Sequence, residues 1–203
     1  GGRDHDGDTV IMLQHKPVYT LGTASSQEYI LQRNEEQSTA SAPSSVEIVR
    51  MDRGGEVTYH GPGQLVVYPI LDLKGGYKQD VHWYMRAMEE AVLRALELAG
   101  VQGAERLEDI TGVWVQNAKV AALGIKCRRW VTQHGLAVNV EESCLENFEG
   151  IVPCGLEGRK VACLNQFLSQ PLTVGEFAPY MKTALEEIFQ IRLVESKVSL
   201  SDF

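Results

Sequence analysis

The chain has 203 residues and a mass of 22.5 kDa, enough to bury one sizeable core as a single domain. Its composition, 44% hydrophobic and 23% charged, is that of an ordinary globular protein, and no apolar run is long enough to span a membrane. The formal net charge of −8 argues against a general nucleic-acid-binding protein, which carries a basic excess, but it leaves room for a local basic patch.

Cysteine usage and the N-terminus bear on the compartment. Cys127, Cys144, Cys154 and Cys163 form no CxxC pair and no dense framework, which favours a reducing environment. The chain opens Gly1-Gly2-Arg3 with neither Met nor a charged-then-apolar leader, so we expect a processed or trimmed product without targeting information.

Three segments in the first third of the chain have strand-like patterns. Residues 9–14 (TVIMLQ) are continuously apolar, as in a buried strand, whereas residues 46–51 (VEIVRM) alternate. Residues 64–73 (QLVVYPILDL) form a longer β-rich run in which Pro69 indicates an edge, a bulge or the strand end. Between them, residues 34–45 are polar and repetitive in composition, which predicts a mobile surface loop.

Two helices are expected. Asp80 is a good N-cap for a helix through Ala99, closed by Gly100. Its predicted core stripe comprises Val81, Met85, Met88, Val92, Ala95 and Ala99. Thr173 and Glu176 have capping-box spacing for the second helix, although Pro179 delays its expected start by a residue or two. Its apolar face comprises Phe177, Met181, Leu185 and Ile188.

A hairpin is predicted in the middle of the chain. Residues 113–115 and 120–125 are apolar and flank the polar turn 116–119, and residues 136–140 add a short strand. Because strands come in groups with only two clear helices, the pattern favours an α+β fold with a mixed, largely antiparallel sheet flanked by helices.

The most unusual segment is a glycine-rich stretch at residues 53–64 (RGGEVTYHGPGQ). Such a loop allows a ligand to approach the backbone closely, but it matches neither a phosphate-binding loop nor a dinucleotide fingerprint, and an ordinary turn is the alternative. Its polar residues Arg53, Tyr59 and His60 favour a site.

Cys154 lies in a tight IVPCGL turn at residues 151–156, where a reactive thiol and a small buried residue are both possible. A free thiol is only about 3% ionised at pH 7, so a nucleophilic cysteine needs a nearby His or Lys. An ammonium about 4 Å away, at an effective dielectric near 20, stabilises the thiolate by roughly 4 kcal/mol, or about three pKa units. Lys119 is one candidate, and an ordinary solvated lysine is the alternative.

Together, four segments resemble the lipoyl(octanoyl) transferase family: residues 53–73, 111–126 (TGVWVQNAKVAALGIK), 134–140 (HGLAVNV) and 151–155 (IVPCG). The earlier segment HKPVYTLG, residues 15–22, is similar to the start of the family's common region. This resemblance implies a fold similar to the catalytic domains of biotin and lipoate protein ligases. It also implies that residues 1–203 are a single octanoyltransferase catalytic domain that lacks the family's N-terminal segment.

The resemblance implies transfer of an octanoyl group from octanoyl-acyl carrier protein to a lipoyl-domain lysine, the first step of protein lipoylation. Cys154 is expected to form a thioester acyl-enzyme, and Lys119 is expected to lower the thiol pKa and carry the proton. The expected substrate-binding residues are Arg53, Gly54, Gly55, Glu56, Val57, Thr58, Tyr59, His60, Ala122, Leu123, Gly124, Gly135, Leu136 and Ala137.

No ATP, metal or other cofactor is implied, and neither nucleic acid nor membrane is an expected partner. The expected partners are octanoyl-acyl carrier protein and the lipoyl domains of 2-oxoacid dehydrogenase complexes and of glycine cleavage H protein. The location implied is the cytoplasm, or the plastid stroma or mitochondrial matrix of a eukaryote. Because an acidic carrier would meet an acidic enzyme, we expect a local basic docking face comprising Lys126, Arg128, Arg129, Arg159 and Lys160.

Two other functions compete. An ATP-dependent lipoate or biotin ligase on the same fold would form an adenylate and would not need Cys154. A truncated acyl-binding module would hold the carrier or lipoyl domain without turnover. Dependence on ATP and on Cys154, and release of free carrier, distinguish the three.

Overall fold

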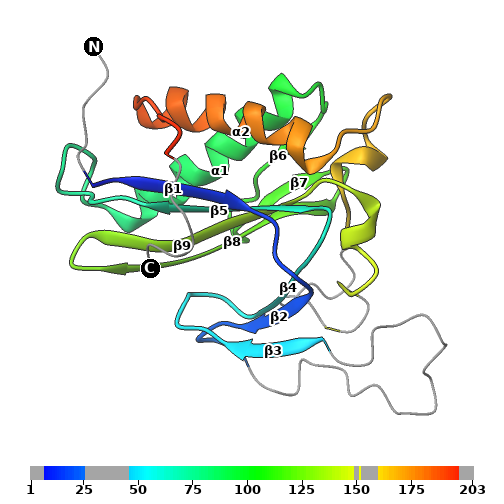
Figure 1. The fold of residues 1–203 in the computed structure, drawn as a ribbon, viewed down its shortest axis with the longest axis horizontal. Helices are drawn as coiled ribbons and strands as arrows, with labels where there is room; N and C mark the ends of the chain where they lie inside the picture. Colours follow the sequence, from blue (N-terminus) through cyan, green and yellow to red (C-terminus); the bar gives the residue numbers. More distant parts are fainter. Residues whose placement is uncertain (1–6, 26–45, 149–150, 152–159, 197–203) are drawn as a thin grey trace.

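The computed structural model describes residues 7–25, 46–148, 151 and 160–196 (Figure 1). The predicted loop at residues 34–45 lies outside the described residues. Helices and strands in the described part form an α+β fold, and most strand pairs are antiparallel, with parallel exceptions, as expected.

The main sheet has seven strands among the described residues. Its order is β1 (Thr9–Leu13), β5 (Gln64–Ile70), β9 (Val131–Asn139), β8 (Ala118–Arg128), β7 (Val113–Val115) and β6 (Ala104–Glu105), with β10 (Lys160–Val161) parallel to β8. A second, three-stranded sheet has the order β3 (Glu47–Arg50), β2 (Val18–Leu21) and β4 (Val57–His60). Short 3₁₀ turns follow β9 and β10, at η3 (Glu142–Cys144) and η5 (Leu164–Gln166).

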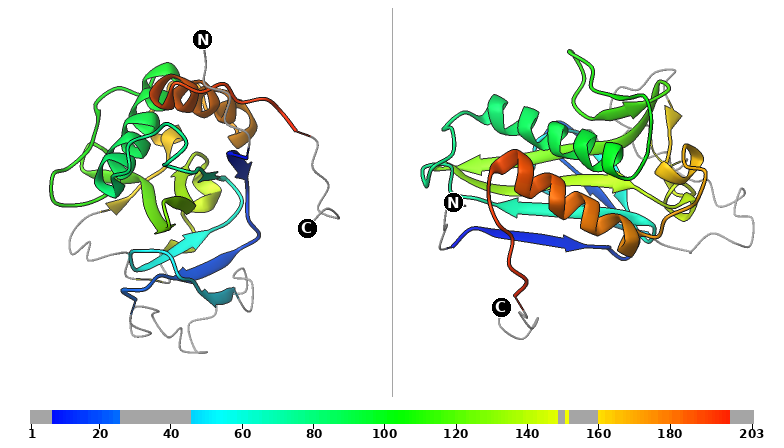
Figure 2. Two further views of the ribbon diagram at one scale, coloured as in Figure 1. Left: turned by 90° about the vertical axis from the view of Figure 1, so that its left-hand side faces the viewer. Right: turned by 90° about the horizontal axis from the view of Figure 1, so that it is seen from above.

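The elements are arranged in layers. Helices α1 (Val81–Leu98) and α2 (Val174–Phe189) cover one face of the main sheet, and the small sheet lies on the other side (Figure 2). The main core lies between the helices and the sheet, and a smaller core belongs to the small sheet. Neither helix in the described part is long and apolar enough to cross a membrane.

Helix α1 has the predicted ends. The Asp80 carboxylate accepts the Trp83 N–H at 3.0 Å, and the helix stops before Gly100, whose φ is +87°. The centre of the predicted stripe is buried at Met88, Val92 and Ala95. Val81 is exposed, so its assignment to the core was wrong; it lies in the first turn.

Helix α2 begins at Val174, so the delayed start predicted from Pro179 was wrong. The Thr173–Glu176 capping box is formed, and the Val174 N–H also donates to the Glu141 carboxylate at 2.9 Å. These bonds satisfy N–H groups of the first turn, which offsets the hydrogen bond that Pro179 cannot donate.

The predicted strands are present, with three differences. The hairpin turn is only Gln116 and Asn117, both with positive φ, so Ala118 and Lys119 already belong to β8. Strands β2, β4, β6 and β10 were not predicted as strands. Pro69 lies beyond the last residue pair of β5 with β9, and the Thr132 hydroxyl bridges this interruption by donating to Pro69 O and accepting from Leu71 N–H.

Candidate active site

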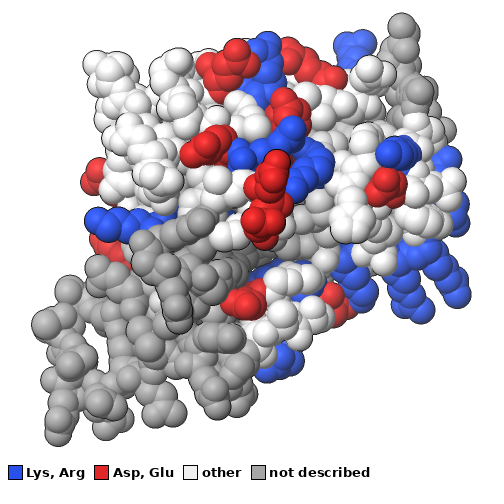
Figure 3. All heavy atoms as spheres, turned by 180° about the vertical axis from the view of Figure 1, so that it is seen from behind, with Lys and Arg blue, Asp and Glu red and all other residues white. Residues whose placement is uncertain are grey.

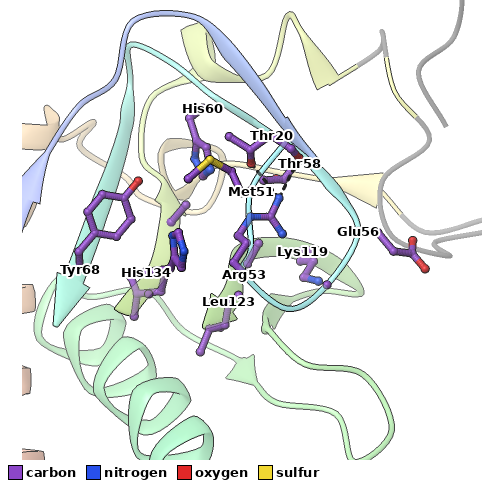
Figure 4. A pocket seen from close by; sticks show the side chains of 16 residues that line it. Thr20, Met51, Arg53, Glu56, Thr58, His60, Tyr68, Lys119, Leu123 and His134 are labelled. Atoms are coloured by element: carbon purple, nitrogen blue, oxygen red, sulfur yellow. Dashed lines mark hydrogen bonds between the residues drawn. The ribbon is translucent and has the colours of Figure 1, made fainter. Parts of the chain in front are cut away.

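An open cavity with about 580 Å³ of empty space lies between the main sheet and the small sheet. The lining residues are Thr20, Met51, Arg53, Gly55, Glu56, Thr58, His60, Tyr68, Lys119, Ala122, Leu123, Gly124, His134, Gly135, Leu136 and Ala137 (Figure 4).

The structure brings together most of the predicted site residues. Those that line the cavity are Arg53, Gly55, Glu56, Thr58, His60, Lys119, Ala122, Leu123, Gly124, Gly135, Leu136 and Ala137. Gly54, Val57 and Tyr59 are not among the lining residues. The Glu56 side chain points away from the other labelled residues (Figure 4).

Strand alternation explains why residues 57–60 divide between two sides. Successive side chains of a strand point to opposite faces. Thr58 and His60 therefore line the cavity, whereas Val57 and Tyr59 pack in the small core with Ile151. The Tyr59 hydroxyl accepts a hydrogen bond from Asn147 Nδ2 at 3.1 Å, so Tyr59 contacts the chain that leads towards Cys154.

The loop before β4 joins the two sheets. Arg53 is 8% exposed, and its guanidinium donates to the carbonyl and hydroxyl of Thr20 on β2, both at 2.8 Å. On the other side, the Gly54 N–H donates to Ile125 O of β8 at 2.8 Å. A Cβ at Gly124 would lie 2.9 Å from Gly54 O, so glycine at 124 allows this close approach.

Lys119 brings a cation to the cavity from β8. Only 8% of the residue is exposed, and its Nζ lies 5.4 Å from the centre of the Trp114 ring on the neighbouring strand β7. A lysine on an aromatic face is stabilised by the negative potential of the ring. The Lys119 carbonyl accepts the Ala162 N–H at 3.0 Å, so the strand that carries Lys119 also holds the chain just after β10.

A buried hydrogen-bond chain fixes the protonation of His60. Asn139 Nδ2 donates to Ala162 O, and Gln64 Nε2 donates to Tyr59 O and to Asn139 Oδ1. Because backbone carbonyls only accept, the orientation of both amides is determined. Gln64 Oε1, 2.7 Å from His60 Nδ1, must then accept, so His60 carries its proton on Nδ1 and keeps a basic Nε2.

The surroundings of His60 also keep its ring neutral. Burial lowers the pKa of His60 to about 4, and the nearby His15 and Arg53 act in the same direction, against the hydrogen bond to Gln64. His15 lies 2.7 Å from the Tyr68 hydroxyl, and burial lowers the pKa of His15 and raises that of Tyr68. Both groups are therefore uncharged at neutral pH, and Tyr68 keeps its proton to donate.

A cluster of ionisable side chains attaches the loop before β4 to the main sheet. Asp52 accepts from Lys126 Nζ of β8 and from His134 Nε2 of β9 at 2.9 Å. These hydrogen bonds hold the pKa of Asp52 well below its usual range, at about 2. His134 has φ +59°, an uncommon value for a residue other than glycine. The cluster therefore links the segment that contains Met51 and Arg53 to the β8–β9 hairpin.

Cys154 and Arg159 lie outside the described residues. On one side of Cys154, Ile151 is buried in the small core; on the other, Val161 is paired with Lys119. Within the residues that the structure describes, no group of three or more His, Cys, Asp or Glu side chains is arranged to hold a metal ion.

The predicted basic face is divided in the structure. Lys160 pairs with Ala118 at one end of the eleven-residue strand β8, and Arg128 lies at the other, roughly 30 Å away. Lys126 is paired with Asp52. Arg128 and Arg129 remain together, exposed, at the β8–β9 turn.

Sequence reasoning missed several residues of this site. Thr20, Met51, Tyr68 and His134 line the cavity, and Gln64, Asn139 and Asp52 support it through hydrogen bonds. Gln64, His134 and Asn139 lie in the segments that carry the family resemblance, but the pairs Gln64–Asn139 and His134–Asp52 join residues that are far apart in sequence.

The geometry defines a two-sheet domain with a cavity between the sheets, and comparison with known proteins places it in a family. Residues 2–186 match the lipoyl protein ligase A/B catalytic domain. A putative lipoate protein ligase from T. acidophilum, solved with bound lipoic acid, superposes with a TM-score of 0.76 at 17% identity, covering 96% of this chain and 78% of that one. Lipoate-protein ligase A bound with ATP superposes with a TM-score of 0.71 at 16% identity, covering 96% of this chain and 78% of that one. These likenesses show the fold.

Sequence relatives narrow the assignment. An octanoyltransferase of Synechococcus sp. (strain WH7803) is 47% identical over 95% of this chain and 74% of its own length. An octanoyltransferase of Nostoc punctiforme is 43% identical over 96% of this chain and 81% of its own length. A chloroplastic octanoyltransferase of Arabidopsis thaliana is 50% identical over 76% of this chain and 52% of its own length. The chain belongs to the octanoyltransferases of the lipoyl protein ligase A/B catalytic-domain family, and it is an acyltransferase.

The His60 assignment predicts a result that NMR can measure. We expect long-range ¹H–¹⁵N spectra to show the Nδ1–H tautomer of His60 and a ring that stays neutral down to about pH 4. Because an unfolded chain protonates its histidines near pH 6.5, this histidine lowers stability as pH falls from about 6.5 to 4, and not above that window.

Asn139→Ala is the comparison variant: it removes one of the two acceptors of the Gln64 amide, leaving Tyr59 O, and should weaken the tautomer preference. An Nε2–H tautomer, or a ring in the wild-type protein that titrates near pH 6.5, would contradict the assignment.

Proposed function

We propose that the protein transfers an octanoyl group from octanoyl-acyl carrier protein to the ε-amino group of a lysine on a lipoyl domain, through a thioester on Cys154. The names of its relatives support the octanoyl group. The observation that carries the proposal is the placement of Lys119: a nearly buried cation lines the cavity, and its strand pairs with the chain that follows Cys154.

In the first step the Cys154 thiolate attacks the thioester carbonyl of the donor. A carbon–sulfur bond forms to Cys154, the bond to the carrier sulfur breaks, and the carrier thiolate takes a proton from the Lys119 ammonium. A cation beside the thiol supplies the thiolate at neutral pH, since the ion pair lowers the thiol pKa.

In the second step the neutral amine of the lipoyl-domain lysine attacks the Cys154 thioester. The amide bond forms, the bond to Cys154 sulfur breaks, and the amine proton passes to the now neutral Lys119. The Cys154 thiolate and the Lys119 ammonium are thereby restored, and no net proton is gained or lost.

The cavity lining suits an apolar eight-carbon chain. Ala122, Leu123 and Gly124 of β8 face Gly135, Leu136 and Ala137 of β9 in register, and all six line the cavity. Four of the six are Gly or Ala, and side chains this small leave room for an acyl tail between the two sheets. His60, held neutral, contributes a polar contact without adding charge.

The proposed acceptors are the lipoyl domains of 2-oxoacid dehydrogenase complexes and of glycine cleavage H protein. The proposed location is the cytoplasm, or the plastid stroma or mitochondrial matrix of a eukaryote. Cyanobacterial relatives and a chloroplastic relative support the cytoplasm and the plastid.

The proposal predicts a covalent intermediate. Incubation with octanoyl-acyl carrier protein and no ATP should add one octanoyl group to the wild-type protein and none to Cys154→Ala, measured by intact-protein mass. Lys119→Met should reduce the rate of adduct formation at pH 7 by about 10²-fold or more, the typical contribution of a proton-transfer group. A lipoyl domain should discharge the adduct.

No adduct on a folded wild-type protein would contradict the acyl-enzyme route. Transfer that requires ATP and free octanoate, and that persists in Cys154→Ala, would indicate a ligase. Binding of the carrier without release of free carrier would indicate a binding module.

The acyl carrier is proposed to dock at the β8–β9 turn. Arg128 and Arg129 are exposed there, and Lys and Arg side chains project at one side of the molecule in Figure 3, whereas charges of both signs mix elsewhere. Several of the other charges are paired, such as Arg94 with Glu187 and Arg106 with Glu90. A basic turn for which the described part of the chain provides no ion-pair partner attracts an acidic carrier despite the net charge of −8.

Charge reversal at this turn tests the docking proposal. Arg128→Glu with Arg129→Glu should raise the KM for the carrier about 10-fold or more, leave kcat near wild type, and weaken the salt dependence of the rate. Lys182→Glu on α2 is the matched control and should leave KM unchanged. An unchanged KM and salt dependence in the double variant would refute docking at the turn.

A further inference from the structure

A buried carboxylate on helix α1 lies outside the cavity and has no part in the chemistry above. Glu89 is 1% exposed, although charged residues are almost never fully buried unless they are paired. Its neighbour Glu90, also on α1, is partly exposed and pairs with Arg106. The burial of Glu89 therefore needs a structural or functional explanation of its own.

Both oxygens of Glu89 hold the segment that precedes β7. Glu89 Oε1 accepts the backbone N–H of Gly112 at 3.0 Å, and Oε2 accepts from Arg86 Nη1 at 2.8 Å. Arg86 also donates to the carbonyl of Glu108 at 3.1 Å. The Arg86–Glu89 pair thus attaches residues 108–112 to helix α1, and its most buried bond ends on Gly112.

Gly112 in turn lies directly against the end of the Lys119 side chain. A Cβ at Gly112 would be 2.4 Å from Lys119 Cε, 3.2 Å from Lys119 Nζ and 2.8 Å from Ala121 O. The φ of Gly112 is +134°, a value that side chains other than hydrogen disfavour. The backbone of Gly112 therefore forms one wall of the space that the Lys119 amine occupies, with the Trp114 ring also close to Nζ.

We propose that Glu89 is a positioning residue for Lys119: by holding the Gly112 N–H, it sets where the Lys119 amine lies in the cavity. This inference rests on the proposed function, since it concerns the group that carries the proton. A displacement of about 1 Å at a reacting group can cost on the order of 10²-fold in rate. The hydrogen bond between Glu89 and Gly112, on the side of the main sheet that carries helix α1, thus affects the position of Lys119 in the cavity.

Three variants of Glu89 distinguish the effect of losing the hydrogen bond to Gly112 from the effect of losing the negative charge. Glu89→Ala removes the acceptor, and Glu89→Asp keeps the charge but is one methylene too short to reach Gly112. Both should lower kcat for octanoyl transfer about 10-fold or more, with KM for the carrier near wild type. Glu89→Gln keeps an oxygen that accepts the Gly112 N–H and should restore kcat to within about 3-fold. Glu90→Ala is the matched control and should leave kcat unchanged.

A double-mutant cycle distinguishes positioning from general stability. Residues that act through one group have non-additive effects. In a Lys119→Met background, Glu89→Asp should therefore cause no further loss in the rate of adduct formation. Additive losses, or wild-type kcat in folded Glu89→Asp and Glu89→Ala, would overturn the proposal. Full activity of Lys119→Met would instead refute the proposed role of Lys119, so the two failures are distinguishable.

Discussion

A lysine amine held in the interior of a two-sheet cavity is the feature on which the rest of the site depends. Removing an ammonium from water is costly unless protein groups replace its hydration. Around Lys119 the Trp114 ring lies on one strand, and the Gly112 backbone packs against the side chain. The two-residue turn at Gln116–Asn117 sets the register that places Lys119 opposite Trp114.

The second constraint is the attachment of the small sheet to the main sheet. Arg53 and Gly54 hydrogen bond to strands of different sheets, and Asp52 adds an ion pair with Lys126 and a hydrogen bond with His134 of the β8–β9 hairpin. These contacts hold the small sheet against the main sheet at the cavity that lies between them. The lining combines small apolar residues with His60 and Tyr68, which burial holds uncharged, and with the basic side chains of Arg53 and Lys119.

Local patterns in the sequence were enough for both ends of α1, for the capping box of α2 and for most strands, because caps, turns and apolar periodicity act over a few residues. Asp80, Thr173 and Glu176 are examples. The division of residues 57–60 between core and cavity could have been expected from strand alternation, but only once β4 was known to be a strand. The pairs Gln64–Asn139 and Asp52–His134 join residues 75 and 82 positions apart, and only the folded sheet brings them together. Glu89 gave no local signal, because its proposed role depends on Gly112, which lies 23 positions away in the segment before β7.

The pH dependence of Cys154 alkylation tests the central claim, that the Lys119 cation activates this thiol. Cys127→Ser serves as background, and burial raises the pKa of Cys144 to about 12 and also raises that of Cys163, so neither competes at neutral pH. The account predicts that Cys154 titrates well below the usual value of about 8.5, and that Lys119→Met raises its pKa by about two to three units. A Cys154 pKa near 8.5 in both proteins would contradict it.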